Sequence, residues 1–520
     1  MLEQKIVMFV DKSYVKKHFE ETEQLLRKIP SKDVAQWILE RGYFPEQNIL
    51  PPSFQVSNFS LNSKPYNKDL NCLTRRQLIN ISHPKTLLKS KVFSIQHPYN
   101  YHDIVFYIEK NWNSILNHLF DKKIKIYSYS LPIPVTKKKS PTLSNLRSGR
   151  MIYEWLQMAE NDLVLDAANY QFIARTDITN FYSSIYTHSI GWALHGRENA
   201  FKDKNFNLFG NKIDKLLQYS NDARTNGISI GSVLSDLIAE IILASIDKNI
   251  STELIKTDFL AVRYKDDYRF LCQTEEQSRY ILKTVSDHLS NFNLSINEHK
   301  TSIQKLPDGL YRKHDRQYFP HKLKEQKEIS FTVFEHTLLI ALDIHRKNPG
   351  TSILEKFVSE IFTNYKDKKL KLKFSKSSKR RKQQVRKVIS LLFLVTRESE
   401  KLLCHVLSVS QQLYLDYRHE QSDLKEYLQS IIKNQIYLAS EKGSIFEIVW
   451  LIFFSRYIGL GITKFDSLIS NKHIKGNEFY KSVLTSKQAI FNDTNINLFK
   501  KPKDCRNISL AQYLDIFNSV

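Results

Sequence analysis

The sequence predicts an α+β protein in which a split βαβ sheet is followed by an all-α, helical-repeat-like C-terminal domain. Three observations lead to this prediction. Between residues 170 and 304, short runs rich in β-branched and aromatic residues alternate with segments of helical periodicity. After about residue 330 the strand signals nearly vanish, and long amphipathic helices follow one another. A length of 520 residues suits two or three domains.

The first 60 residues predict an N-terminal helical segment. Helical spacing runs over residues 15–29 and 33–41, and the segment ends in the Pro-containing connector GYFPEQNILPPSF. From residue 61 to about 165, short apolar runs are mixed with polar loops, including the basic loop VTKKKSPTLSNLRSGR. We therefore expect a second domain over residues 61–325.

The centre of that domain predicts the element order β-α-β-β-α-β, a split βαβ sheet with helices on one face. The predicted strands are residues 171–178, 259–264, 268–272 and 294–303. The predicted helices are a stretch ending near residue 194, then residues 212–219, 233–246 and 275–292. This architecture hosts many functions, so it does not decide the function here.

The C-terminal part, residues 326–520, predicts a separate helical domain. The predicted helices are residues 331–346, 352–365, 383–397, 401–417, 423–438 and 445–457. They show no strict repeat period, but successive helix pairs would suit an irregular α-solenoid of the HEAT type.

The charge of the chain is strongly positive. Its net charge is +23, from 77 Lys and Arg against 54 Asp and Glu. Such a surplus favours a polyanionic partner, and nucleic acid is the commonest one. A membrane surface or a basic bias across a whole genome would give the same surplus. Residues 366–387 hold twelve Lys or Arg, which fits either a solvated helix face or an arm that follows a phosphate backbone.

The cysteines and the apolar segments indicate a cytoplasmic protein without a membrane partner. The four cysteines are Cys72, Cys272, Cys404 and Cys505. They form no CxxC pair, which indicates reduced thiols and no zinc site. The opening MLEQKIVMFVDKSY has too short an apolar stretch for a signal peptide. Glu447 and Arg456 interrupt the most apolar region, so it predicts a buried helix and not a membrane span.

Two segments 89 positions apart carry the chemistry. ARTDITNFYSSIYTHSI places Asp177 at the end of a strand, and VRYKDDYRFLC places Asp266 and Asp267 at the tip of a hairpin. Adjacent strand ends can bring these carboxylates together. Two Mg²⁺ ions held there could activate a 3′-hydroxyl and stabilise a leaving pyrophosphate. One Asp in a turn is usually only a turn former, so the prediction depends on both segments.

The order of the motifs resembles that of the reverse transcriptases. Asp177 matches the aspartate of motif A, and YKDD at 264–267 matches motif C, usually written YxDD. GISIGSVLSD at 227–236 matches motif B, and NEHKTSI at 297–303 resembles the motif D segment that ends in Lys-Thr. The resemblance implies reverse-transcriptase fingers and palm over residues 61–325.

The same resemblance implies an activity and a set of site residues. The activity is that of a nucleotidyltransferase using dNTPs and two Mg²⁺ ions, for which Mn²⁺ is an alternative. The implied catalytic residues are Asp177, Asp266, Asp267 and Lys300. The implied metal ligands are Asp177, Ile178, Asp266 and Asp267. The implied nucleotide-binding residues are Phe181, Tyr182, Ile230 and Gly231.

Several of these residues also have an ordinary structural interpretation. Tyr182 follows Asp177 by five residues, where the family packs an aromatic against the incoming sugar and so excludes a ribose 2′-hydroxyl. Phe181 and Tyr182 could equally be core aromatics at a strand–helix junction. Lys300 could neutralise or protonate the leaving pyrophosphate, or be one surface lysine among many. We expect Arg263 to be an ordinary strand or hairpin residue, and Lys265 to fill the variable position of motif C.

Motif B departs from the family pattern. The family has a Pro-Gln-Gly core whose glutamine lies near the nucleotide and template, whereas this chain has Ser229, Ile230 and Gly231. The glycine, which permits close backbone approach, is kept. Ile230 can neither donate nor accept a hydrogen bond through its side chain, which argues against ordinary templated copying but leaves the metal chemistry intact.

A narrower resemblance follows from NFYSSIYTHSIGWALHG, GISIGSVLSDLIAEIIL and the connector GYFPEQNILPPSF. These segments resemble the abortive-infection (Abi, AbiK-like) and defence-associated reverse transcriptases of bacteria. That resemblance implies a helical-repeat C-terminal domain, homo-oligomers, and untemplated DNA synthesis primed from a protein tyrosine. The single-stranded DNA product would stay covalently attached. The priming tyrosine is unknown; Tyr43, beside the connector, is a candidate because loops supply mobile groups.

Three interpretations remain open. The first is a protein-primed, template-independent DNA polymerase that acts in anti-phage defence. The second is an RNA-templated, retron-like reverse transcriptase with an associated RNA as partner. The third is a non-catalytic nucleic-acid-binding scaffold, against which the presence of all three aspartates argues.

Overall fold

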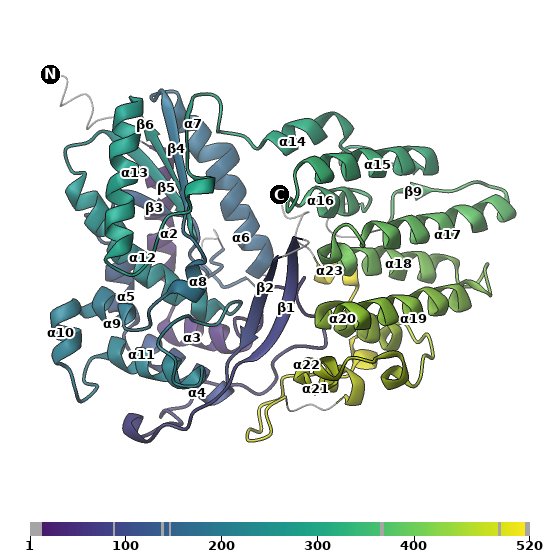
Figure 1. Ribbon diagram of the computed structural model, residues 1–520, viewed down its shortest axis with the longest axis horizontal. Helices are drawn as coiled ribbons and strands as arrows, with labels where there is room; N and C mark the ends of the chain where they lie inside the picture. The colour runs from purple at the N-terminus through teal and green to yellow at the C-terminus, as the bar shows by residue number, and fades with distance from the viewer. Residues whose placement is uncertain are drawn as a thin grey trace. The chain divides into compact units, whose positions relative to one another are not determined.

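The computed structural model describes residues 13–86, 89–136, 140–144, 147–363, 369–486 and 490–514 (Figure 1). These residues form two compact units. Unit 1 takes its residues from Met1–Pro45, Phe59–Leu78 and Ser94–Tyr311. Unit 2 takes its residues from Glu46–Asn58, Ile79–Phe93 and Arg312–Val520.

Unit 1 is built on a five-stranded sheet with the strand order β3-β5-β6-β4-β7. Its strands are β3 (Ile126–Ser128), β4 (Phe172–Asp177), β5 (Phe259–Tyr264), β6 (Asp267–Cys272) and β7 (Ser302–Lys305). β3 runs parallel to β5, and the other neighbouring pairs are antiparallel. The predicted split βαβ sheet is confirmed. The sequence did not reveal β3, because three residues are too few to show alternation.

Helices cover both faces of this sheet, so the expectation of helices on one face was wrong. α12 (Val233–Glu253) and α13 (Glu275–Ser290) lie along one face (Figure 1). On the other face, Ile173 and Leu271 share a core with Met158 and Leu163. β5 and β6 are buried along nearly their whole length, as their continuous apolar runs require when both faces are covered.

The core on that second face comes from segments far apart in the chain. It includes α2 (Tyr14–Arg27) and α7 (Leu163–Ala167), which are joined through Asp166. The carboxylate of Asp166 accepts hydrogen bonds from the backbone amides of Tyr14 and Val15, each at 3.2 Å. This contact caps the first turn of α2, where amide groups lack partners inside the helix.

Unit 1 contains further helices, several of which pack against one another. They are α3 (Ser31–Glu40), α4 (Pro98–Lys110), α5 (Trp112–Leu119), α6 (Arg147–Leu156), α8 (Phe181–Ser184), α9 (Ser189–His195), α10 (Arg197–Lys202) and α11 (Phe209–Ser220). Short irregular helices lie at Leu70–Cys72, Gln157–Asp162 and Glu298–Lys300. α12, the longest helix of the unit, begins where the Ser232 hydroxyl accepts from the Ser235 amide.

Unit 2 is mainly helical, as predicted for the C-terminal part. Its longer helices are α15 (Phe331–Lys347), α16 (Ile353–Glu360), α17 (Ser378–Val395), α18 (Leu403–Tyr417), α19 (Leu424–Lys442), α20 (Ile445–Tyr457) and α22 (Glu478–Thr485). Its shorter helices are Lys313–Tyr318 (α14), Phe319–His321, Glu400–Leu402, Phe465–Leu468, Lys472–Gly476 (α21), Pro502–Cys505 and Leu510–Tyr513 (α23). α16 ends earlier than predicted, and residues 364–365 of that prediction lie outside the described residues.

Two small sheets complete unit 2. One pairs β1 (Ile79–Thr86) with β2 (Lys89–Ile95), and most of β2 belongs to this unit. The other pairs β8 (Ile329–Ser330) with β9 (Leu372–Lys373). β1 packs against α20, where the His83 ring meets Phe446 edge to face at 4.7 Å.

The apolar helix α20 forms the core of unit 2. Trp450 is fully buried, and its indole N–H donates to the Ile49 carbonyl at 3.2 Å. Arg456 donates to the carbonyls of Val483 and Leu484, so its charge is met inside the unit. No helix of the described part of the chain combines the length and the apolar character needed to cross a membrane.

Candidate active site

Two antiparallel strands bring the predicted aspartates to one end of the sheet. In the ladder between β4 and β6, Asp177 lies directly opposite Asp267. Directly opposed residues project from the same face, with Cβ atoms about 5 Å apart. Asp266 lies in the two-residue turn between β5 and β6, and its carbonyl accepts from the Ile178 amide at 3.1 Å. The four predicted metal ligands are therefore neighbours.

Lys300 lies at the same edge. Its ammonium group donates to Oδ2 of Asp177 at 2.6 Å, and about half of its side chain is exposed. The segment that carries it is fastened to β4 by two further bonds. The Asn297 amide donates to the Asp177 carbonyl at 2.7 Å, and the Thr301 and Thr176 hydroxyls are 2.8 Å apart.

The donors at this edge suit a magnesium ion. Among the described residues, no three side chains of Asp, Glu, His or Cys are grouped closely enough to hold a metal by themselves. Mg²⁺, however, keeps waters and is completed by substrate phosphates, so one or two carboxylates suffice. Both opposed carboxylates already attract cations: Lys300 contacts Asp177, and the Arg269 guanidinium is 3.4 Å from Asp267. Ile178 could contribute only its backbone carbonyl.

The turn that carries Asp266 has a strained backbone. Lys265 has a φ of 53°, in the left-handed region, which costs a residue with a Cβ about 1–2 kcal/mol. Its amide donates to the Ser130 hydroxyl at 2.7 Å, and its carbonyl accepts from the Arg263 guanidinium at 3.1 Å. These bonds hold a conformation that the turn would not keep alone.

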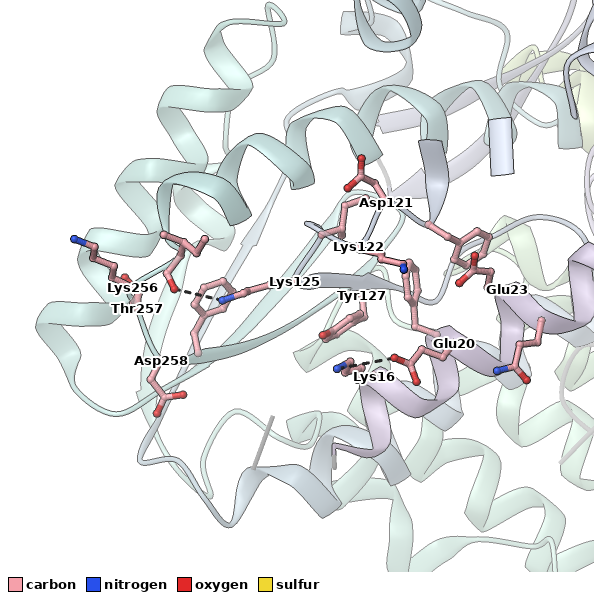
Figure 2. A pocket seen from close by; sticks show the side chains of 16 residues that line it. Lys16, Glu20, Glu23, Asp121, Lys122, Lys125, Tyr127, Lys256, Thr257 and Asp258 are labelled. Atoms are coloured by element: carbon pink, nitrogen blue, oxygen red, sulfur yellow. Dashed lines mark hydrogen bonds and ion pairs between the residues drawn. The ribbon is translucent and has the colours of Figure 1, made fainter. Parts of the chain in front are cut away.

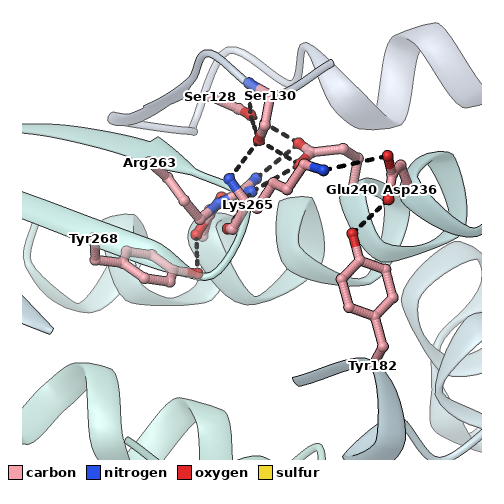
Figure 3. Close-up of polar contacts among 9 residues, drawn as sticks. Ser128, Ser130, Tyr182, Asp236, Glu240, Arg263, Lys265 and Tyr268 are labelled. Carbon is pink, nitrogen blue, oxygen red and sulfur yellow. Dashed lines mark hydrogen bonds and ion pairs between the residues drawn. The ribbon is translucent and has the colours of Figure 1, made fainter. Parts of the chain in front are cut away.

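Beneath the turn lies a buried charge network (Figure 3). Arg263 is 1% exposed and donates to both carboxylate oxygens of Glu240 and to Oδ2 of Asp247, at 2.9–3.1 Å. Tyr268 donates to the other oxygen of Asp247 at 2.8 Å, and Ser130 donates to Glu240 at 2.6 Å. Burial opposes the charge of Arg263, but the two carboxylates hold its pKa above the ordinary value.

The sequence-based interpretation of Arg263 as an ordinary hairpin residue was therefore wrong. It bridges β5 to α12 through two carboxylates, and it also supports the turn. A buried Arg requires partners, and the acids at Glu240 and Asp247 are seven residues apart on one helix face. The seven-residue spacing of these two acids was the sequence signal that could have indicated partners for Arg263.

Tyr182 is joined to motif B and motif C by one carboxylate. Its hydroxyl donates to Oδ1 of Asp236 at 2.5 Å, and the Lys265 ammonium lies 3.4 Å from Oδ2 of the same residue (Figure 3). Tyr182 and Phe181 are 7% and 3% exposed, and their rings are in contact. Lys265 thus does more than fill the variable position of YxDD.

Comparison with known families agrees with this arrangement. Residues 114–389, more than half of the chain, match the family described as "Reverse transcriptase (RNA-dependent DNA polymerase)". The chain belongs to the reverse transcriptase family. This is the family that the motifs predicted. No curated protein matches the chain.

Solved structures with some similarity to this reverse transcriptase include telomerases from two Candida species. Apo telomerase from Candida tropicalis is 13% identical over 81% of this chain and 70% of that one, with a TM-score of 0.29. A form truncated from the C-terminal domain is 14% identical over 48% and 52%, with a TM-score of 0.28. The chain thus spans about half the length of that form. Candida albicans telomerase with a fragment of telomeric RNA is 13% identical over 70% and 62%, with a TM-score of 0.27.

Motif B of this reverse transcriptase is connected to a glutamine from elsewhere in the chain. Gln96 is 3% exposed, and its amide donates to the Ser229 hydroxyl at 2.7 Å. The carbonyl of the half-buried Ile230 accepts from the Ser94 amide at 2.9 Å, and Gly231 has a φ of 123°, which favours glycine. Gln96 lies outside every motif, so the sequence did not single it out. Its Oε1 is buried and has no hydrogen-bond partner among the residues that the structure describes.

Tyr43 does not have the mobility for which it was singled out. It is 1% exposed, its ring packs edge to face against Phe44 and Tyr101, and its hydroxyl donates to the Gln96 carbonyl at 2.5 Å. Burial, with a contribution from Tyr101, raises its pKa well above the ordinary value, which makes it a poor nucleophile. Tyr43 is not mobile because the start of the connector packs into the core of unit 1.

A cavity of about 810 Å³ is lined in part by residues of α2, and Figure 2 shows the side chains around it. Phe259 and Asp258, at the start of β5, line it, whereas the aspartates follow the end of that strand. None of the predicted site residues contributes to it. Cationic and acidic side chains both line it, and Lys16 and Glu20 are within ion-pair distance at 3.9 Å. The cavity therefore shows no preference for an anion.

The described part of the basic segment forms β9 and the start of α17. Several of its cations meet acids within unit 2: Lys373 contacts Glu328, Arg381 contacts Glu420, and Lys382 contacts Asp423. Residues 366–368 of this segment lie outside the described residues. These ion pairs favour the solvated-face interpretation.

Proposed function

We propose that this chain is a DNA polymerase that transfers nucleotides from dNTPs by two-metal chemistry. The observation that carries the proposal is the opposition of Asp177 and Asp267 at the strand ends, beside the turn that holds Asp266. The Asp177, Asp266 and Asp267 carboxylates and the Ile178 carbonyl would hold two Mg²⁺. When bound, the ions activate the attacking hydroxyl and stabilise the leaving pyrophosphate.

Lys300 supplies positive charge to the leaving group. In the structure its ammonium contacts Asp177, and its half-exposed side chain can exchange that carboxylate for a pyrophosphate oxygen. An ammonium is both a compact phosphate ligand and a proton donor.

Tyr182 selects the sugar of the incoming nucleotide. Its position five residues after Asp177 and its bulk support a clash with a ribose 2′-hydroxyl. Tyr182→Ala should admit ribonucleotides while incorporation of dNTPs continues. An unchanged preference for dNTPs would mean that Tyr182 is only a core residue.

The biological role that we propose is anti-phage defence by abortive infection, with DNA synthesis that needs no template. Two observations support it: the resemblance of the palm segments to Abi-type enzymes, and Ile230 in place of the motif B glutamine. The product would start on a protein tyrosine and remain attached to a homo-oligomer.

The test uses purified protein from which nucleic acid has been removed. Labelled dNTPs are supplied with and without a defined RNA, and the protein is then digested and analysed by mass spectrometry. A nucleotide adduct on a tyrosine, formed without RNA, is the expected result. Asp267→Ala serves as the inactive control. Synthesis only with the RNA, giving a complementary product, would contradict the untemplated proposal.

One observation favours the RNA-templated alternative. Gln96 brings a side-chain amide to Ser229 of motif B, and within the described part of the chain its buried Oε1 has no hydrogen-bond partner. An amide is thus present beside motif B despite Ile230. If the enzyme copies RNA, Gln96→Leu should lower the rate of RNA-directed synthesis about tenfold. A tenfold change corresponds to about 1.4 kcal/mol in the activation free energy. Under the untemplated proposal Gln96→Leu should leave RNA-independent incorporation unchanged.

A further inference from the structure

One carboxylate connects the tip of the β5–β6 turn to the aromatic ring that follows motif A. Asp236, on the first turn of α12, accepts from the Tyr182 hydroxyl at 2.5 Å through Oδ1. Its Oδ2 lies 3.4 Å from the Lys265 ammonium. Figure 3 shows the chain of contacts running from Lys265 through Asp236 to the Tyr182 ring.

These contacts lie largely out of water. Asp236 is 5% exposed and Tyr182 is 7% exposed, while the Lys265 side chain is 22% exposed. Hydrogen bonds and charge pairs are stronger in such surroundings than at the surface. If the Tyr182 ring turned away, the Asp236 carboxylate would lose a charge-assisted hydrogen bond inside the protein. The ring is therefore held in one position.

The backbone of Lys265 is also held in place by hydrogen bonds. The backbone amide of Lys265 donates to Ser130, and its carbonyl accepts from Arg263, which is itself buried and ion-paired. Because its amide and carbonyl are both hydrogen-bonded, the backbone of Lys265 is fixed in the turn that also carries Asp266. The side chain extends from this turn to Asp236. The position of the Tyr182 ring thus depends on the turn that carries a predicted metal ligand.

We propose that Lys265 and Asp236 are positioning residues that hold the Tyr182 ring against the sugar of the incoming nucleotide. They thereby set how strongly the enzyme discriminates against ribonucleotides. The inference rests on the proposed function, in which Tyr182 faces that sugar. Loss of the Lys265 cation relaxes Asp236 and lets the ring move, which gives space for a 2′-hydroxyl.

The first experiment measures kcat/KM for dGTP and for GTP. Lys265→Met should lower the ratio of kcat/KM for dGTP to kcat/KM for GTP about tenfold. This change is equivalent to about 1.4 kcal/mol of transition-state discrimination. Lys265→Arg, which keeps the cation, should restore most of the ratio. Lys283→Met is the matched control, because Lys283 is an exposed lysine that pairs with Asp287 on α13. It should leave the ratio unchanged.

A double-mutant cycle separates positioning from a general structural effect. In the Tyr182→Phe background the hydroxyl is absent, so Lys265→Met should change the ratio no further. A fall in kcat/KM that is equal for dGTP and GTP overturns the proposal. An equal change of the ratio in both backgrounds also overturns it.

A second measurement does not depend on activity. With 3-fluorotyrosine placed at position 182, the ¹⁹F resonance should shift or broaden in Lys265→Met and remain unchanged in Lys283→Met. An unchanged resonance in Lys265→Met overturns the proposed contact, whatever the enzyme does with nucleotides. A wild-type protein that incorporates no nucleotide contradicts the proposed function instead, so the two failures are distinguishable.

Discussion

The Lys300 ammonium lies 2.6 Å from Oδ2 of Asp177, although the two residues are 123 positions apart. A side-chain cation thus occupies a carboxylate oxygen that a metal ion would use. The half-exposed lysine can leave without disturbing a packed core. Lys300 is therefore expected to compete with a metal ion for Asp177. It is also a candidate to contact the leaving pyrophosphate.

Lys300→Met should therefore change two quantities in opposite directions. Removal of the competing cation should tighten Mg²⁺ binding to the nucleotide-free protein, measured by isothermal titration calorimetry. Loss of the proposed proton donor should slow dNTP incorporation by about a hundredfold or more. Lys305→Met, at an exposed position on β7, is the control. Weaker metal binding together with normal incorporation would contradict both roles.

Replacement of any one of Asp177, Asp266 and Asp267 by Ala should abolish nucleotide incorporation. Each change removes a negative charge from the proposed two-metal site, and a loss of several kcal/mol corresponds to about a thousandfold or more in rate. Thermal unfolding should change little, because these residues lie at strand termini or in the turn and do not fill the core. Asp287→Ala on the exposed face of α13 is the control. An Asp177→Ala enzyme with normal activity would exclude the assignment.

Arg263→Met should destabilise unit 1 by about 3–5 kcal/mol, because Glu240 and Asp247 would keep buried charges without their partner. Urea unfolding measures the change. Arg279→Met should shift the free energy of unfolding by less than about 0.5 kcal/mol, since Arg279 is a surface residue on α13. Equal stability of the two variants would mean that the network contributes nothing to the fold.

The stability of unit 2 should fall as the pH rises from about 4.5 to about 7. Burial, reinforced by Glu400 and opposed by Lys442, raises the pKa of the Glu447 carboxyl to about 7 from its ordinary 4.5. The folded state keeps the proton through this range while the unfolded chain releases it, so ionisation favours unfolding. The full effect is about 3 kcal/mol by pH 7.5.

Hydrogen exchange of α20 peptides checks this prediction. Protection factors for the wild type should fall between pH 5 and pH 7.5, whereas those for Glu447→Gln should stay nearly constant. A parallel fall in the two proteins would assign the pH dependence to other groups.

Elements whose signals are local could be predicted from the amino-acid sequence. α20 has the bounds that its apolar run predicted, residues 445–457, and the strands on either side of the KDD turn were found within one residue. The neighbourhood of Asp177 and Asp267 followed from the same information, because strand ends in a split βαβ sheet meet at one edge. Such features depend on residues a few positions apart, and periodicity reports them directly.

The partners of the buried charged and polar groups, in contrast, became known only from the folded chain. Arg263 with Glu240, Lys265 with Asp236, and Gln96 with Ser229 all join segments that no local pattern connects. The same holds for β1, which belongs to unit 2 although it lies early in the chain. A buried charge or amide is stable only beside a partner of matching chemistry. Which partner it meets depends on how segments far apart in the chain pack against each other. Local patterns in one sequence do not show that packing.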